Sequence, residues 1–144
     1  MNLYAESSAI LCWLLDEARA PEVRAPLGAA ELVLASSITL IECERVLIRA
    51  VATNIIPEMV AAERRAVLAR TADHWVVLDL DAEAAERARR PFPAEPIRTL
   101  DAIHLATAVL ARSLVDELAV LSLDERIRHS AEQMGFQVLP KDGA

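Results

Sequence analysis

Short apolar runs that alternate with amphipathic segments constrain the fold of this sequence more than any other feature. Five runs have the length and composition of buried strands: residues 3–5, 31–36, 75–80, 118–123 and 136–139. Strands that alternate with helices usually pair in parallel, with helices on both faces of the sheet. The sequence therefore predicts an α/β fold of three layers, in which a mostly parallel sheet of four to five strands lies between helices.

The segments between these runs repeat apolar residues at spacings of three and four, which is typical of helices that cover a sheet. Pro57 suits the start of one helix, and Gly135 suits the end of another. Residues 91–99 hold three of the seven prolines, so we expect a stiff loop there. Residues 100–115 are apolar on most sides and should form the central helix. Further helices are expected at residues 8–17, from residue 39, and at residues 57–73, 81–90 and 124–135.

The length and composition indicate one domain, residues 1–144, with a substantial core. Apolar residues make up 54% of the chain, which excludes a disordered protein. No apolar run reaches the length of about 18 residues that a membrane helix needs, and no basic stretch precedes the first apolar segment. We therefore expect a soluble, cytoplasmic protein without membrane contacts. Cys12 and Cys43 form no CxxC motif and are interpreted as buried thiols.

The formal charge of −7 argues against a general nucleic-acid binder, which usually has an excess of basic residues. It does not exclude a nuclease, because a cluster of carboxylates lowers the net charge while bound cations or local arginines hold phosphates. Lys141 is the only lysine among the 15 basic residues, so the other 14 are arginines. Arginine is the residue type that makes bidentate contacts to phosphate.

Four acidic residues stand where predicted strands end and predicted helices begin. Glu6 and Asp124 end two of the strands, and Glu42 and Asp101 lie in the first turns of two helices. Sites in parallel sheets lie beyond the carboxyl ends of the strands, so we expect these acids to meet there. Any one of them alone could serve only to stabilise a helix N-terminus. Several buried carboxylates together repel one another, and their combination indicates a site for a divalent cation.

Mg²⁺ or Mn²⁺ fits such a site, because the sequence around the acids offers no cluster of thiolates or imidazoles. A cation held there can convert a bound water into a nucleophile and stabilise a phosphodiester under in-line attack. The acids therefore predict a metal-dependent hydrolase that acts on phosphodiester bonds.

Four segments of the chain resemble the PIN-domain ribonucleases, and most closely the VapC toxins of bacterial toxin–antitoxin pairs. These segments are LYAESSAIL, SSITLIECERVLIRA, IRTLDAIHLATA and LAVLSLDERIRHSAEQMGFQVL, of which the third is the most specific. Together they span nearly the whole chain in the order of the family. The resemblance implies a PIN-like three-layer α/β/α fold and cleavage of RNA that depends on Mg²⁺ or Mn²⁺. It also implies inhibition by a cognate VapB-type antitoxin and assembly as a homodimer.

The resemblance assigns the metal-binding and catalytic roles by position. The residues that match the acidic positions of the family are Glu6, Glu42, Asp101 and Asp124. Asp101 and Glu6 would hold the principal cation, while Asp124 and Glu42 would complete its shell or position the attacking water.

Hydroxyl and arginine side chains near the acids are candidates for supporting roles. Ser8 and Ser122 match the family positions whose hydroxyls orient metal, water or phosphate. Three arginines close to the acids in sequence are candidates for RNA binding, namely Arg45, Arg98 and Arg126.

Glu6 departs from the family, which normally has aspartate at this position. The extra methylene moves the carboxylate outward by roughly 1 Å, and Mg²⁺ requires near-ideal octahedral geometry. The change could shift the metal, favour Mn²⁺ or reduce turnover. An alternative function is therefore a catalytically weakened PIN-like module that binds RNA or an antitoxin. A receiver domain also places acids at strand ends, but it needs a lysine after a late strand, which Lys141 does not supply.

Two further groups of residues have competing interpretations. His104 follows Asp101 by three positions on nearly the same helical face, and we interpret it as a packed or hydrogen-bonded histidine rather than a metal ligand. Trp13, Leu14 and Leu15 fit either a groove for an antitoxin helix or the protein core.

Overall fold

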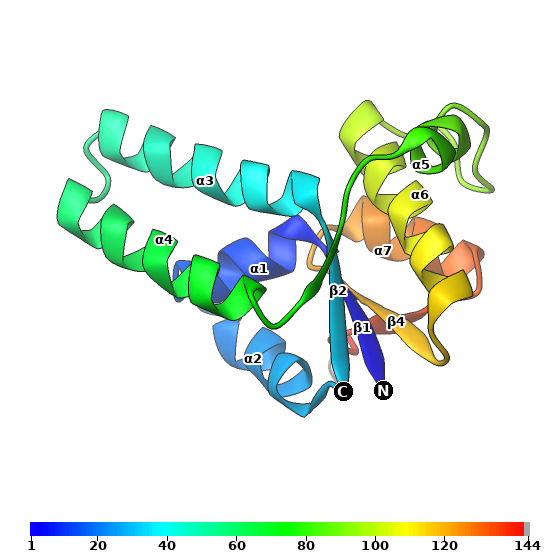
Figure 1. Ribbon diagram of the computed structural model, residues 1–144, viewed down its shortest axis with the longest axis horizontal. Helices are drawn as coiled ribbons and strands as arrows, with labels where there is room; N and C mark the ends of the chain where they lie inside the picture. Colours follow the sequence, from blue (N-terminus) through cyan, green and yellow to red (C-terminus); the bar gives the residue numbers. More distant parts are fainter. Residues whose placement is uncertain (143–144) are drawn as a thin grey trace.

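A five-stranded sheet forms the centre of the computed structural model, which describes residues 1–142 (Figure 1). The strands lie in the order β3-β2-β1-β4-β5, and every neighbouring pair is parallel. The predicted parallel sheet is thus confirmed, and it has no antiparallel edge. The strands are β1 (Asn2–Ala5), β2 (Leu32–Ser36), β3 (Val76–Leu78), β4 (Leu118–Leu121) and β5 (Gln137–Leu139).

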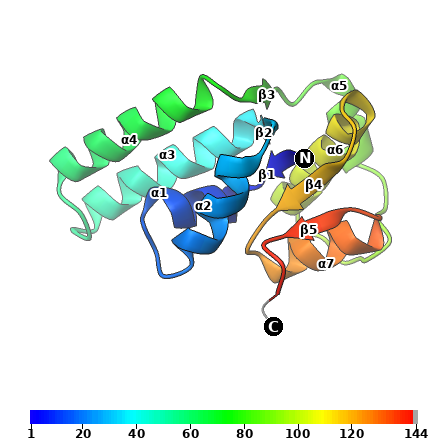
Figure 2. The ribbon, with the colours of Figure 1, turned by 90° about the horizontal axis from the view of Figure 1, so that it is seen from below.

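Helices cover both faces of this sheet and make the outer two layers (Figure 2). The helices on one face are α1 (Ser7–Leu14), α2 (Ala20–Ala29), α3 (Ser37–Ala52) and α4 (Glu58–Ala72). Those on the other face are α5 (Ala82–Ala88), α6 (Thr99–Leu114) and α7 (Glu125–Gln133). The three-layer arrangement agrees with the prediction.

Alternate side chains along the central strand pack into different layers. Leu3 and Ala5 of β1 are buried against the side of the sheet that α1 to α4 cover. Tyr4 lies between them in sequence and packs on the opposite side with Leu105 of α6 and Val138 of β5. The period of two along the strand therefore sends apolar side chains to both cores, as expected for a strand buried on both faces.

The structure differs from the sequence prediction by one additional helix and by several element boundaries, such as the end of α1 at Leu14 rather than residue 17 and of β4 at Leu121 rather than residue 123. Helix α2 is not predicted by the sequence, because Pro26 inside residues 20–29 disfavours a helix there, whereas Pro21 lies in the first turn, where proline is tolerated. Strand β3 is shorter than the predicted run of residues 75–80. Helix α3 begins at Ser37 rather than at residue 39, because the Ser36 side chain accepts a hydrogen bond from the backbone amide of Ile38 and caps the helix.

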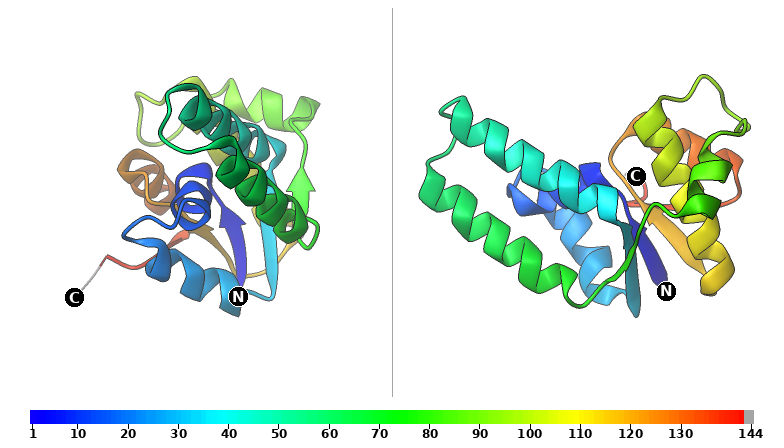
Figure 3. Two further views of the ribbon diagram at one scale, coloured as in Figure 1. Left: turned by 90° about the vertical axis from the view of Figure 1, so that its left-hand side faces the viewer. Right: turned by 45° about the horizontal axis from the view of Figure 1, so that its top comes forward.

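Helices α3 and α4 lie side by side as an antiparallel pair that extends beyond the edge of the sheet (Figure 3). Cys43 and Leu47 of α3 and Ala61 and Leu68 of α4 are buried in one apolar cluster with Ala5 of β1 and Val33 of β2, which joins the pair to the sheet. Within residues 1–142, no helix combines the length and the apolar character that crossing a bilayer requires.

Candidate active site

All four predicted acids line one pocket of about 460 Å³ beyond the carboxyl ends of the strands. Glu6 directly follows β1 and caps α1, and Asp124 lies three residues after β4 and caps α7. Asp101 lies in the first turn of α6, as predicted. Glu42 lies in the second turn of α3 rather than the first, because that helix begins at Ser37, two residues before the predicted start. The fold thus brings together side chains from four separate parts of the sequence.

Glu6 is buried, and one of its carboxylate oxygens is enclosed by hydrogen-bond donors. Its Oε2 accepts hydrogen bonds from the backbone amide of Ser8, from the Ser8 hydroxyl and from the Ser122 hydroxyl, which lies 2.8 Å away. Burial raises the pKa of the Glu6 carboxyl, although these hydrogen bonds oppose the increase. The two predicted hydroxyl residues therefore contact Glu6 directly.

The Ser8 hydroxyl also joins Glu6 to the loop that carries Asp124. Its oxygen accepts hydrogen bonds from the backbone amides of Leu123 and Asp124, at 2.9 and 3.1 Å. The Ser8 hydroxyl therefore adds to the contact between Ser122 and Glu6 in holding the start of α1 to the segment between β4 and α7.

Glu42 is held by a buried hydrogen-bond network that the sequence did not reveal. Its Oε1 lies 2.7 Å from the Ser7 hydroxyl and 2.7 Å from Nε2 of His104. Nδ1 of His104 lies 3.1 Å from the Tyr4 hydroxyl. Burial alone would raise the pKa of the Glu42 carboxyl, but the hydrogen bonds from His104 and Ser7 outweigh it and lower the pKa overall. Glu42 is therefore kept ionised.

His104 is thus a buried, hydrogen-bonded histidine, which confirms the interpretation from its sequence position. Ser7 and Tyr4 were missed. Their only sequence signal is position, because Ser7 stands between Glu6 and Ser8 and Tyr4 points to the opposite face of β1 from its neighbours.

Asp101 and Asp124 form the more exposed half of the pocket. Partial burial and the negative charge of Asp124 raise the pKa of the Asp101 carboxyl, while the Arg126 guanidinium opposes the increase. Asp124 uses Oδ1 to accept a hydrogen bond from the backbone amide of Arg126 at the start of α7. These two carboxylates are close enough to repel each other, which is the condition that a cation would relieve.

The donor set suits a hard cation. The pocket presents carboxylates and hydroxyls, and the nitrogens of its one imidazole, His104, are already hydrogen-bonded. Among residues 1–142, no group of three or more histidine, cysteine, aspartate or glutamate side chains is arranged to hold a metal ion by itself. Mg²⁺ does not need one, since it is commonly held by one or two carboxylates together with waters and substrate phosphates. The residues therefore fit a magnesium or manganese ion that is completed by substrate.

Two of the three arginines predicted to bind RNA lie at the pocket, and the third does not. Arg98, which precedes α6, and Arg126 of α7 both line the pocket. Arg126 also lies 3.8 Å from Asp124 in a loose ion pair. Arg45 is exposed on α3 and is not among the residues that line the pocket.

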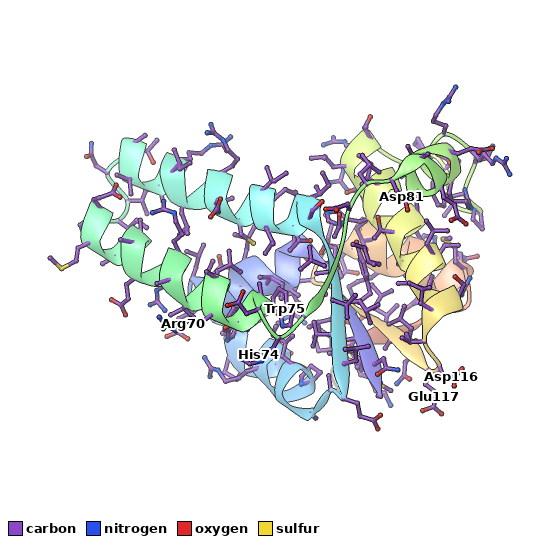
Figure 4. All side chains as sticks on the ribbon, in the orientation of Figure 1. Arg70, His74, Trp75, Asp81, Asp116 and Glu117 are labelled. Carbon is purple, nitrogen blue, oxygen red and sulfur yellow. The ribbon has the colours of Figure 1, made fainter. Side chains whose placement is uncertain are left out.

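Acids outside the pocket have structural or solvent-exposed positions. Asp81 caps α5 by accepting a hydrogen bond from the Ala84 amide at 2.8 Å. Asp116 and Glu117 lie before β4 at the amino end of the sheet, opposite the pocket (Figure 4). Of the acids in residues 1–142, the pocket is lined by Glu6, Glu42, Asp101 and Asp124.

A family model for the PIN domain matches residues 3–133. Ribonuclease VapC35 of Mycobacterium tuberculosis, represented by two strains, is 32% identical over 139 residues, which are 96% of this chain and 87% of the relative. The chain belongs to the VapC group of the PIN domain family.

Solved structures share the fold of this PIN domain. VapC20 of Mycobacterium tuberculosis, described as a sarcin–ricin loop cleaving toxin, aligns with a TM-score of 0.64 and 16% identity over 93% of this chain and 95% of the other. VapBC2 of Rickettsia felis, bound to a DNA fragment from its promoter, aligns with a TM-score of 0.64 and 8% identity over 96% and 97%. A toxin–antitoxin complex from Klebsiella pneumoniae aligns with a TM-score of 0.63 and 20% identity over the full length of both chains. These likenesses confirm the predicted PIN-like fold.

Proposed function

We propose that this PIN domain is an endoribonuclease that hydrolyses RNA phosphodiester bonds with Mg²⁺ or Mn²⁺, as the toxin of a VapBC-type pair. The observation that carries the proposal is the convergence of Glu6, Glu42, Asp101 and Asp124 on one pocket. Its relationship to a protein named as a ribonuclease supports the same activity.

Asp101 and Glu6 would hold the cation, with Asp124 beside them. Oε1 of Glu6 and the Asp101 carboxylate make no hydrogen bond to any other residue in the described part of the chain, so these oxygens are available as ligands. When bound, the cation supplies an activated water and stabilises negative charge on the phosphate.

Glu42 is suited to act on the attacking water. Ser7 and His104 occupy its Oε1, which leaves Oε2 to accept a proton. Arg98 and Arg126 line the same pocket and would bind the phosphates on either side of the scissile bond. The substrate would then lie across the carboxyl ends of the strands.

Cleavage of RNA by the purified protein in Mg²⁺ or Mn²⁺ tests this proposal. Asp101→Asn removes the charge at the pocket while leaving the start of α6 intact, so cleavage should fall by about 100- to 1,000-fold. Asp116→Asn is the matched control, because Asp116 is exposed at the opposite end of the sheet. Equal cleavage by Asp101→Asn and the wild type, or full activity in excess EDTA, would show that the chemistry is assigned to the wrong residues.

A catalytically weakened module remains the second candidate function. The observation that favours it is that Glu6, already longer than the family aspartate, has Oε2 bonded to Ser8 and Ser122. Such a module would show neither new RNA ends nor a rise in melting temperature on addition of Mn²⁺, whereas the nuclease should show both.

We also propose a VapB-type antitoxin as partner, a homodimeric assembly and a cytoplasmic location, where RNA is accessible. Two of the similar structures are described as VapBC2 and as a toxin–antitoxin complex. Ile41 and Ile48 are exposed seven residues apart on one side of α3, and such apolar side chains suit a protein partner.

Leu14 lies in the core, so Trp13, Leu14 and Leu15 do not together form a free groove. A small open reading frame beside the gene that encodes a DNA-binding protein would support the pairing, and size measurement in solution tests the dimer.

A further inference from the structure

A second cavity adjoins the carboxylate pocket and is larger than it. The cavity has a volume of about 690 Å³ and shares Arg98, Asp101 and Arg126 with the carboxylate pocket. This volume falls within the range of about 300 to 1,000 Å³ that is usual for sites that bind small organic molecules. We call this cavity the α7 cavity. An RNA strand that places a phosphate at the carboxylates would carry its neighbouring nucleotide toward it.

One wall of the α7 cavity is a polar face of α7. Arg126, His129, Ser130 and Gln133 line it, at spacings of three, four and seven residues that place them on one side of the helix. The opposite side of α7 is apolar, and Ile127 and Ala131 are buried in the core. The imidazole, hydroxyl and amide groups of the polar face offer hydrogen-bond donors and acceptors to a ligand.

The other wall is the proline loop, which is apolar and internally braced. Pro93, Pro96 and Ile97 supply apolar surface to the cavity. The Glu95 carboxylate accepts hydrogen bonds from the backbone amides of Phe92 and Ile97, at 2.8 and 2.9 Å. Both Glu95 oxygens are therefore used within the loop, and the wall is formed before any ligand arrives.

We propose that the α7 cavity binds one unpaired RNA base beside the cleaved phosphodiester, and that Gln133 reads the edge of that base. The proposal rests on the proposed ribonuclease function. A base has a flat face that packs on apolar surface and a polar edge that needs hydrogen bonds, and the two walls match these requirements. The amide of Gln133 both donates and accepts, as bidentate contact with a base edge requires.

Charge favours a nucleotide over a basic peptide segment as the occupant. Arg98 and Arg126 stand where the α7 cavity meets the carboxylate pocket, and there they would bind the phosphate that links two nucleotides. Both oxygens of the Glu95 carboxylate already accept hydrogen bonds from backbone amides of its own loop. Asp101 belongs to the carboxylate pocket, where a cation would neutralise it.

Titration with the four nucleoside 5′-monophosphates, followed by NMR, tests the cavity without any need for cleavage. We expect resonances of α7 and of residues 93–97 to shift, with a preference among the four bases. Gln133→Ala should lower the affinity for the preferred nucleotide by about tenfold, because it removes hydrogen bonds to the base. Gln137→Ala is the matched control, since Gln137 is an exposed glutamine on β5 that does not line the cavity. Absence of shifts in α7, or equal affinity in Gln133→Ala and the wild type, would overturn the inference.

Sequencing of RNA ends separates this inference from the proposed function. The wild type should prefer one base at a fixed position next to the cut, and Gln133→Ala should cut with that preference lost. Cutting by Gln133→Ala with an unchanged preference would overturn the base-reading role and leave the ribonuclease function standing. A wild type that binds mononucleotides at α7 but cuts no RNA would instead count against the ribonuclease function.

Discussion

Nε2 of His104 lies 2.7 Å from Oε1 of Glu42, although the two residues are 62 positions apart in the sequence. The other ring nitrogen of His104 lies 3.1 Å from the Tyr4 hydroxyl. One buried ring therefore joins β1, α3 and α6 and fixes the orientation of an acid in the pocket. A histidine in this position acts by positioning Glu42, and it does not need to touch RNA or metal.

Replacement of His104 tests this positioning role. His104→Ala should lower the rate of RNA cleavage by about 10- to 100-fold, the usual effect of removing a residue that orients a functional side chain. It should also lower the free energy of unfolding by about 1 to 3 kcal/mol, because Glu42 and Tyr4 lose a buried partner. His104→Gln should recover part of the rate, since its amide can donate to Oε1 of Glu42. His74→Ala is the control, as His74 is exposed and lies away from the pocket (Figure 4). Unchanged cleavage by folded His104→Ala would show that Glu42 needs no such support.

The raised pKa of Glu6 predicts a pH-dependent effect of Glu6→Gln on stability. Burial raises the pKa of this carboxyl in the folded protein, so the native state binds the proton more tightly than the unfolded state does. This contribution is present at low pH and is lost as the pH rises through the folded pKa. Glu6→Gln, which cannot ionise, should therefore melt several degrees higher than the wild type near neutral pH. The difference should shrink as the pH falls through the raised folded pKa toward the ordinary pKa of glutamate, below which it should not change further. Thermal unfolding of both proteins across this range measures the difference, and a constant offset at every pH would contradict the prediction.

Glu6→Asp tests the consequence of the extra methylene. The shorter side chain withdraws the carboxylate toward the backbone, which is the geometry that the VapC family normally uses. We expect Glu6→Asp to increase cleavage in Mg²⁺ relative to cleavage in Mn²⁺, because Mg²⁺ tolerates less distortion of its octahedral shell. The ratio of initial rates in the two metals is the measurement. An identical ratio in both proteins would mean that Glu6 does not control metal preference.

The two cysteines should be inert in the folded protein. Both are free and buried, which confirms their interpretation as buried thiols. Burial, together with the charge of Glu42, raises the pKa of Cys43 to about 12, and burial also raises the pKa of Cys12. Thiolate is the reactive form, so iodoacetamide at mildly alkaline pH should label neither residue in the native state and both after denaturation. Rapid labelling of Cys43 in the native protein would show that the base of α3 opens to solvent.

The parallel sheet and most of the helices could be predicted because each depends on a local pattern. The strand β4 and the helix α6, for example, have apolar runs and spacings that need no information from the rest of the chain. Helix α2 could not be predicted in this way. Pro26 disfavours a helix locally, and the helix forms where Ala20 and Val23 become buried against residues of α1 and β4. Tertiary packing thus overrides the local preference.

The acids of the pocket could be predicted for a similar reason. In a parallel sheet, the residues that follow the strands lie at the same end of the sheet, regardless of the length of the connections between the strands. Glu6 and Asp124 were therefore expected to lie near each other at that end. The bonds that hold Glu42 could not be predicted, because they depend on which way the side chains of Tyr4, Ser7 and His104 turn within the folded core.

The position of β1 in the middle of the sheet determines when the pocket can form during synthesis of the chain. Strand β1 is made before both of its partners, β2 and β4, and the Ser8 oxygen needs the amides of Leu123 and Asp124 as partners. A growing chain that stops before these residues lacks Asp124 and the strand that carries it into place. Synthesis must therefore pass β4 and Asp124 before the pocket can be completed, and shorter products lack one of its four carboxylates.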